Sequence, residues 1–360
     1  MAAEPSFAQA SWQRLKKNSP AMVGLALIGL SILLAAGAYF VAPDASPNAN
    51  RIILEIGGKK PGFSQQFLLL KKNAVPQVSF WERLIRGKLD AAEYIPITSF
   101  QRKKDSVYAD KYVDEGVTEK IVHVPAALQP PFVQTKTFWL GTDGYGRDIL
   151  SRLVVGTRVS LGVGLVTVII SLLLGITLGA VAGYFRGRTD DVVMWLINVV
   201  WSIPTLLLVF AITLVLGKGF WQVFIAVGLT LWVNVARLVR GQVLAARELQ
   251  YVEAAKTLGY SSTRTIVRHI LPNIFGPVLV IAAGNFASAI VIEAGLSFLG
   301  VGVQPPQPSW GLMIKENYNF IITQNPALAL APGFAIMLLV LAFNLLGTGL
   351  RDALNVREKT

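Results

Sequence analysis

Acidic and amide side chains inside apolar segments are the first candidates for chemistry in this sequence. Glu293 directly follows the apolar stretch 274–292, and Asn285 lies within that stretch. A carboxylate in a membrane-embedded helix is costly and is by default functional, as part of a substrate path or a proton relay. Asn285 could instead bond a neighbouring helix, and Glu293 could lie near the membrane surface. We expect both side chains to face a translocation path.

A second group of charges precedes another apolar stretch. The segment 140–152 reads LGTDGYGRDILSR and holds opposite charges at close spacing. Asp148 and Arg152 stand four positions apart, which suits an ion pair on adjacent turns of a helix. The sequence predicts a surface salt-bridge cluster at the start of a membrane span, or alternatively a contact for a substrate-delivery protein. The motif residues are Gly141, Thr142, Asp143, Gly146, Arg147 and Asp148.

A polar and basic segment, 247–273, lies between two apolar stretches. It begins with good helix formers, and Gly259 can adopt the left-handed conformation that ends a helix. Ser261 or Ser262 can cap a second helix, which Pro272 would end at the preceding residue. The prediction is a rigid helix–turn–helix outside the bilayer, suited to contact with a partner. An ordinary solvated loop is the simpler alternative.

The spacings of common catalytic and metal sites are missing from the sequence. It contains no GxxxxGK[ST] motif, so the chain cannot cradle ATP phosphates as a P-loop does. His123 and His269 stand alone, outside any HExxH pattern, and the chain has no cysteine. Disulfides and thiolate metal sites are therefore excluded. We expect no catalytic residue, no metal and no cofactor in this chain.

Composition points to a membrane protein. Of the 360 residues, 53% are hydrophobic and 15% are charged, whereas about 25% are charged in a typical soluble domain. The net charge is +12. The basic residues flank apolar stretches instead of lining one face together with aromatic residues, so we exclude nucleic acid as a partner. Cytoplasmic Lys and Arg residues of a membrane protein explain the charge more simply.

Six apolar stretches can cross a bilayer, whose hydrocarbon core is roughly 30 Å thick. They cover about 21–42, 159–185, 192–216, 220–236, 274–292 and 327–350. The first is longer than the apolar region of a signal peptide and is therefore expected to be retained. Pro204 should kink the third span. In the second span, Gly175, Gly179 and Gly183 have the GxxxG spacing that lets helices approach closely.

The distribution of basic residues orients these spans. Arg14, Lys16 and Lys17 precede the first span, which places the N-terminus in the cytoplasm. Four crossings then bring the segment 247–273 back to the cytoplasm, and six bring the C-terminus back. The expected layout is a cytoplasmic tail 1–20, a first span 21–42, an extracytoplasmic loop or subdomain 43–157, a core 158–351 with a cytoplasmic loop 237–273, and a cytoplasmic tail 352–360.

Three blocks resemble one family of transport proteins. The residues Glu253, Ala254 and Ala255, followed by Gly259 and then by Leu271 and Pro272, are similar to the EAA loop of ABC importer permeases. Two further blocks resemble the C-type permeases of dipeptide and oligopeptide importers: 140–152, and 293–300 followed by 304–311. In one departure from the pattern, His269 occupies the place of an isoleucine, and Ile270 follows it.

The resemblance implies an all-α membrane protein with six transmembrane helices. A large extracytoplasmic insert of mixed structure would lie between the first two helices. In this family the EAA loop docks into a groove on a cytoplasmic ATPase subunit. The implied ATPase-coupling residues are Glu253, Ala254, Ala255, Gly259, Leu271 and Pro272.

The resemblance also implies an assembly. The chain would pair with a sister permease, two ABC ATPases that bind ATP and Mg²⁺, and an extracytoplasmic substrate-binding protein. It would lie in the inner (cytoplasmic) membrane of a bacterium and form half of a translocation path for peptides, without enzyme activity of its own.

Two other classes of protein remain as alternatives. A stand-alone secondary transporter could use Glu293 as a proton relay, but it would be expected to contain internal repeats and discontinuous helices. Neither is evident in the sequence. A membrane-anchored binding module could place its function in residues 44–157. That segment carries no recognisable motif, and five further spans exceed what an anchor needs.

Overall fold

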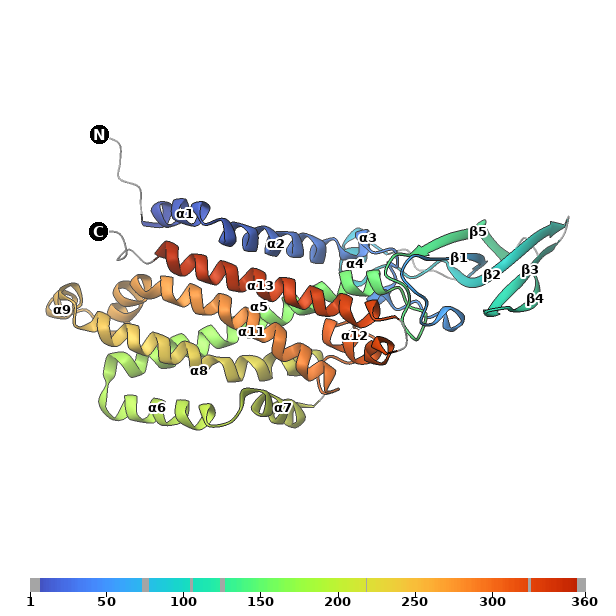
Figure 1. Ribbon diagram of the computed structural model, residues 1–360. Helices are drawn as coiled ribbons and strands as arrows, with labels where there is room; N and C mark the ends of the chain where they lie inside the picture. Colours follow the sequence, from blue (N-terminus) through green and yellow to red (C-terminus); the bar gives the residue numbers. More distant parts are fainter. Residues whose placement is uncertain are drawn as a thin grey trace, which may run out of the picture. The chain divides into compact units, whose positions relative to one another are not determined.

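The computed structural model describes residues 7–72, 78–103, 106–123, 127–217, 219–322 and 325–354. The chain divides into two compact units (Figure 1). The helical unit contains residues 1–31, 160–303 and 336–360, and the sheet unit contains residues 32–159 and 304–335. Of the predicted tails, residues 1–6 and 355–360 lie outside the described part of the chain.

The helices before the sheet and after it include long apolar ones and two polar ones. They are α1 (Phe7–Lys17), α2 (Ser19–Ala36), α5 (Ile149–Phe185), α6 (Gly187–Trp201), α7 (Thr205–Leu216), α8 (Phe220–Arg247), α9 (Gln250–Thr257), α11 (Phe275–Phe298) and α13 (Ala327–Leu354). The two polar helices are α1 and α9. Within the described residues, five helices are long and apolar enough to cross a membrane: α2, α5, α8, the run 262–298 and α13. A sixth span results if α6 and α7 together make one crossing.

The third predicted span is broken. The helices α6 and α7 meet at an angle of 92°, and Pro204 stands at the residue before α7. Proline has no backbone N–H and its ring collides with the preceding turn of a helix, so a helix cannot continue smoothly through it. The sequence predicts a kink at this proline, and the structure contains a sharp bend there.

Small residues bring α5 and α8 into close contact, as the GxxxG spacing predicts. A Cβ atom at Gly179 would lie 2.5 Å from the carbonyl oxygen of Ala236, and one at Gly183 would lie 2.7 Å from that of Arg240. At Gly175 a Cβ atom would overlap the side chain of Val235. Any side chain at these positions would force the two helix backbones apart.

Two predicted spans are longer in the structure. The helix α5 begins at Ile149, well before the predicted start of the second span, and α8 continues to Arg247. Both extensions contain arginine residues. The predicted spans stop short of them because those spans are defined as uninterrupted apolar sequence. Helix propensity and membrane insertion are separate properties, so the helices extend beyond the segments that hydropathy identifies.

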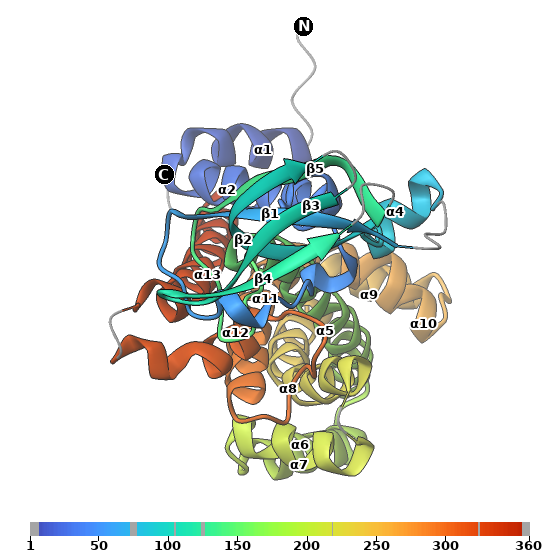
Figure 2. The same cartoon turned by 90° about the vertical axis from the view of Figure 1, so that its right-hand side faces the viewer.

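The sheet unit is built around five antiparallel strands. They are β1 (Phe63–Lys71), β2 (Ala92–Lys103), β3 (Ser106–Asp114), β4 (Val117–His123) and β5 (Leu128–Phe138). Their order is β4-β3-β2-β1-β5, so β3, β2 and β1 are interior and β4 and β5 are the edge strands (Figure 2). Along β1 the apolar side chains alternate: Phe67 and Leu69 pack into one cluster and Leu68 into another. Successive residues of a strand point to opposite faces, so both faces of this strand are buried.

Short elements complete the sheet unit. They are α3 (Ala38–Val41), η1 (Pro47–Ala49), η2 (Leu54–Ile56), α4 (Phe80–Arg86), α12 (Trp310–Asn317) and η6 (Tyr318–Ile321). Ile53 and Ile56 pack against Phe67 and Phe138 on one side of the sheet. The strands thus have a hydrophobic core of their own, formed within residues 43–157.

Candidate functional site

The turn after α9 has the hydrogen bonds of a tightly closed helix end. Gly259 has φ +74°. The backbone N–H of Tyr260 donates to the carbonyl of Ala255 at 3.1 Å, and that of Gly259 donates to Lys256 at 2.9 Å. This pair of bonds defines a Schellman motif, in which the residue after the cap takes the left-handed conformation. The predicted role of Gly259 in ending the helix is confirmed.

The helix that follows begins as predicted. The short helix α10 (Ser262–Thr265) is capped by Ser261, whose hydroxyl accepts a hydrogen bond of 3.3 Å from the backbone N–H of Arg264. A serine oxygen at this position satisfies one of the amide groups that a helix start leaves without a partner.

The predicted end of this helix at Pro272 is wrong. The chain passes through a π-helical segment (Ile266–Ile270) and a 3₁₀ turn (Leu271–Ile274) directly into α11. The N–H of Leu271 donates to Ile266, five residues earlier. Wider and tighter turns of this kind let a helical path accommodate a proline that has no N–H to donate. The segment is therefore joined rigidly to the long helix after it.

One side of the α9–α10 segment (residues 250–274) is anchored in an apolar core. Val252, Ile266 and Ile270 are buried together with Val239 and Val243 of α8. These contacts come from α9 and from the π-helical stretch after α10, so the segment packs on α8 at both of its ends.

The other side is exposed. Of the six predicted coupling residues, Glu253, Ala254, Gly259 and Pro272 are exposed, Leu271 is half-buried and Ala255 is buried. Leu258 is 70% exposed beside them. An exposed leucine and a short stretch of small residues form a surface on which a partner could pack.

Aromatic and basic side chains stiffen the segment. The ring of His269 stacks on that of Tyr260, with centroids 5.6 Å apart, and the guanidinium of Arg264 lies 4.1 Å from the Tyr260 ring centroid. His269, which departs from the family pattern, therefore packs the π-helical stretch 266–270 against the turn between α9 and α10.

The second predicted motif, Gly141–Asp148, lies in the sheet unit. Asp143 accepts hydrogen bonds from the backbone N–H groups of Tyr145 and Arg147 at 2.9 and 3.0 Å. Gly146 has φ +72°, and a Cβ atom there would overlap the carbonyl oxygen of Ile53. The hydroxyl of Thr142 donates to the carbonyl of Ile56. The glycines thus allow a tight turn that packs directly against the neighbouring backbone.

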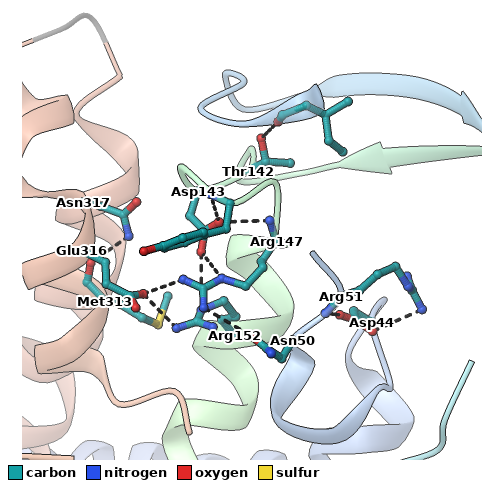
Figure 3. A network of polar contacts seen from close by, with 12 residues as sticks. Asp44, Asn50, Arg51, Thr142, Asp143, Arg147, Arg152, Met313, Glu316 and Asn317 are labelled. Carbon is teal, nitrogen blue, oxygen red and sulfur yellow. Dashed lines mark hydrogen bonds and ion pairs between the residues drawn. The ribbon is translucent and has the colours of Figure 1, made fainter. Parts of the chain in front are cut away.

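The charges of this motif form a buried network (Figure 3). Arg147 Nε lies 2.6 Å from Asp143 Oδ2, and its Nη2 lies 2.7 Å from Oε2 of Glu316 on α12. Arg152 Nη2 lies 3.0 Å from the same Glu316 oxygen. Asp143 is fully buried, Arg147 is 4% exposed and Arg152 is 1% exposed. The prediction of a surface cluster is therefore wrong.

The predicted Asp148–Arg152 pair is also replaced. The carboxylate of Asp148 accepts hydrogen bonds from the N–H and the hydroxyl of Ser151, and so caps the first turn of α5. Burial raises the pKa of Asp148, and the hydrogen bonds from Ser151 offset this only in part. Arg152 turns instead towards Glu316 and Asp143. Sequence spacing identified the charged residues but paired them wrongly.

Sequence reasoning missed two participants in this part of the structure. Glu316 is the shared counter-ion of two arginines, and Arg51 pairs with Asp44 at 3.2 Å and with Asp90 at 2.5 Å. Burial alone would lower the pKa of Arg51, but the hydrogen bond to Asp90 and the nearby carboxylates raise it. The partners of Arg51 lie in different segments of the chain, so no local spacing reveals them.

Glu293 and Asn285 are both buried inside the helical unit. Glu293 has no exposed surface and accepts a hydrogen bond of 2.6 Å from the hydroxyl of Ser297. The same hydroxyl accepts a bond of 3.0 Å from the N–H of Val303, which holds the chain after α11 against that helix. Asn285 donates to Ser171 of α5 at 3.2 Å. In this structure the contacts of both residues are with the interior of the chain itself.

Metal binding has no evident site in the part of the chain described here. No group of three or more His, Asp or Glu side chains among those residues could hold a metal ion.

Comparison with known proteins places these elements in a family. Residues 175–359 match the family described as binding-protein-dependent transport system inner membrane component. Residues 6–54 match the N-terminal transmembrane domain of oligopeptide transport permease C.

Individual relatives cover most of the chain. The dipeptide transport system permease protein DppC of Alkalihalophilus pseudofirmus is 42% identical over 280 residues, which are 78% of this chain and 90% of that protein. DppC of Lactococcus lactis subsp. cremoris is 32% identical over 352 residues, which are 98% of this chain and 91% of that protein.

A chain in a solved structure of inward-facing conformations of the MetNI methionine ABC transporter is 19% identical, with a TM-score of 0.44, over 56% of this chain and 96% of that one. By the match of more than half of its residues, and by relatives aligned over nearly their full length, this chain belongs to the binding-protein-dependent transport system inner membrane components.

Proposed function

We propose that this chain is a permease subunit of an ABC importer for dipeptides or oligopeptides. The observation that carries the proposal is its 42% identity to a dipeptide permease along 90% of that protein. The chain would form half of the translocation path in a bacterial inner membrane and pair with a sister permease. Two ABC ATPases would bind ATP and Mg²⁺ on the cytoplasmic side, and an extracytoplasmic binding protein would deliver the peptide.

The α9–α10 segment is the proposed contact with the ATPase. Its exposed side carries Glu253, Ala254 and Gly259, and its buried side packs on α8. It is also continuous with α11 through the turns around Pro272. A partner that moves this segment would therefore move two membrane helices together, which is what a change from outward to inward access requires.

This proposal requires six crossings. If α2 leaves the cytoplasm, the sheet unit's strands lie outside, and α5 returns to the basic turn at Arg186 and Arg188. The bent pair α6–α7 must then cross once for α8 to end inside with α9. A re-entrant α6–α7 pair would leave α9 outside, away from any ATPase.

Labelling of single cysteines tests the topology, because the chain contains none of its own. Lys256→Cys on α9 and Val122→Cys on β4 are both at exposed positions. A membrane-impermeant maleimide applied from outside is expected to label the Val122 variant only. Labelling of both variants in sealed cells would contradict the six-span arrangement.

Affinity purification from the native membrane in mild detergent tests the assembly. We expect P-loop ATPases and a second permease to be recovered with the chain. Glu253→Lys combined with Gly259→Val should remove the ATPases but keep the sister permease. The matched control is Glu119→Lys on β4, a charge reversal at an exposed glutamate that should leave recovery unchanged. Recovery of the chain alone, still able to transport, would favour a secondary transporter.

A further inference from the structure

The short helix α4 carries an exposed aromatic and aliphatic face. Phe80 is 62% exposed, Trp81 is 69% exposed and Ile85 is 60% exposed. On the neighbouring α3, Phe40 and Val41 are 43% and 58% exposed. Large apolar side chains gathered in this way mark a surface that something apolar covers. We call these five residues the α3–α4 patch.

The part of the patch on α3 lies close in sequence to the end of α2, a helix long and apolar enough to cross a membrane. The helix α3 follows α2 after a single residue, Gly37, whose N–H donates to the carbonyl of Leu33 on α2 at 2.9 Å and whose carbonyl accepts from the N–H of Val41 on α3 at 3.1 Å. The 18 residues of α2 span about 27 Å, and α3 adds a further turn. The hydrocarbon core is about 30 Å thick, so an α2 that crosses the bilayer would place α3 at the boundary between acyl chains and headgroups.

The helix α4 is fixed firmly at this depth. The rings of Phe80 and Phe40 lie 5.6 Å apart, and Lys88 N–H donates to the carbonyl of Ala45 at 2.8 Å. A Cβ atom at Gly87 would lie 2.6 Å from the oxygen of Ala45. Arg158 of α5 donates to the carbonyl of Ile85 at 3.0 Å, at the end of α4. The exposed face is therefore held in place and does not belong to a loose loop.

Basic side chains accompany the patch on α4 and directly after it. Arg83 and Arg86 lie on α4, and Lys88 follows it. The guanidinium of Arg83 stacks over the ring of Phe40 at 4.7 Å, and neither arginine forms an ion pair among the described residues. One acid, Glu82, accompanies them. Arginine residues next to aromatic residues at the membrane surface are well placed to bind lipid phosphates. A guanidinium group binds a phosphate through two parallel hydrogen bonds.

We propose that the α3–α4 patch is a membrane-interface anchor, which inserts Phe80, Trp81 and Ile85 among phospholipid headgroups and places Arg83 and Arg86 against their phosphates. Aromatic residues at the ends of spans and basic residues at the same level are the side chains that favour this interface. The proposal goes beyond the transport function and rests only on α2 crossing the membrane. The anchor would fix the level of the adjoining sheet unit segments relative to the bilayer surface.

Spin labels at single introduced cysteines measure this directly. The full chain, with any co-purified subunits, is placed in nanodiscs that contain phosphatidylethanolamine and phosphatidylglycerol. Trp81→Cys and Ile85→Cys probe the patch, Leu33→Cys on α2 is the membrane control, and Val122→Cys on β4 is the aqueous control; Leu33 is 72% exposed and Val122 is 52% exposed. Power saturation compares collision with oxygen, which concentrates in acyl chains, with collision with a water-soluble nickel chelate.

The expected oxygen-to-nickel accessibility ratio at Trp81→Cys and Ile85→Cys is several-fold above that of Val122→Cys and below that of Leu33→Cys. A ratio equal to that of Val122→Cys would overturn the proposal, because the patch would then face water. Low accessibility to both reagents would also overturn it, because a partner protein would then cover the patch. Each variant must elute as a single species with the parent's circular dichroism for its ratio to count.

Discussion

Arg152 on the first turn of α5 donates a hydrogen bond of 3.0 Å to Glu316 on α12, across 164 residues of sequence. Arg147 reaches the same carboxylate oxygen at 2.7 Å. One carboxylate thus holds together two guanidinium groups that would otherwise repel each other in a buried place. Arg152 Nε and Nη1 have no hydrogen-bond partner among the described residues, so the pairing with Glu316 is the main compensation for burying this charge.

Replacing Glu316 should therefore be costly. Glu316→Gln leaves two buried arginines short of a counter-charge, and breaking a buried ion pair in this way costs roughly 3–5 kcal/mol. We expect the midpoint of thermal unfolding of the purified chain in detergent to fall by several degrees. The control is Glu115→Gln, whose side chain is 85% exposed and pairs with Lys59 at the surface. An equal effect of the two substitutions would show that the network contributes little.

The close packing of α5 on α8 predicts opposite effects for two glycines. Gly179→Ala forces a Cβ atom to within 2.5 Å of the Ala236 carbonyl oxygen and should destabilise the chain by about 1–3 kcal/mol, as overpacking does. A Cβ atom at Gly241 on α8 meets nothing within 4 Å. Gly241→Ala should be neutral or stabilising because alanine is the better helix former. Thermal unfolding in detergent, measured for both variants, distinguishes them; equal midpoints would contradict the packing argument.

Local signals in the sequence were enough for the turn after α9, since Gly259 and Ser261 act through hydrogen bonds to near neighbours. They were not enough for Glu316 or Arg51, because those partners are brought together only by the tertiary fold. Pro272 misled the prediction for a different reason. A proline removes a hydrogen bond from a regular α-helix, but a π-helical segment and a 3₁₀ turn give the backbone another helical route. No motif in the sequence specified the five strands within residues 63–138 or their order.

The backbone conformation of Gly259 predicts a graded response to substitution. Its φ of +74° is open to asparagine at a modest cost and is strongly unfavourable for β-branched residues. No atom lies within 4 Å of a Cβ built there, so size alone is not the obstacle. We expect ATP-driven uptake in proteoliposomes to be largely kept in Gly259→Asn and lost in Gly259→Val. Uptake at the parental rate in both would mean that the closed turn is not needed for coupling.

Lys136 gives a prediction about pH. Burial lowers the pKa of Lys136 to about 8, and the charge of Arg51 acts in the same direction. The unfolded chain, with a lysine pKa of roughly 10.4, binds more protons than the folded chain between these values. The free energy of unfolding therefore rises with pH from about 8 towards 10 as Lys136 loses its proton in the folded chain. Below pH 8 the lysine is charged, and the full free-energy cost of burying its charge is present.

Lys136→Met keeps the aliphatic contact with Tyr94, whose ring centroid lies 4.1 Å from the lysine nitrogen. We expect it to raise the unfolding midpoint near pH 7 and to lose this advantage near pH 9.5. Lys111→Met is the control, for which the opposite change in stability is expected. A hydrogen bond from Lys111 to Glu55 raises the pKa of Lys111, so its charge stabilises the folded chain. That variant should be less stable near pH 7. A pH-independent difference between Lys136→Met and the parent would contradict the assignment.

Substitutions of Glu293 distinguish an ABC importer permease from a secondary transporter that uses this residue as a proton relay. If its role is to hold Ser297, and through it Val303, the side chain needs an oxygen that accepts a hydrogen bond but does not need to ionise. Glu293→Gln keeps such an oxygen, so ATP-driven uptake should remain close to the parental rate, whereas Glu293→Leu should lose both uptake and thermal stability. A proton relay would instead require a group that binds and releases a proton. Loss of uptake in Glu293→Gln, with an unchanged unfolding midpoint, would therefore support the relay and count against the structural role assigned here.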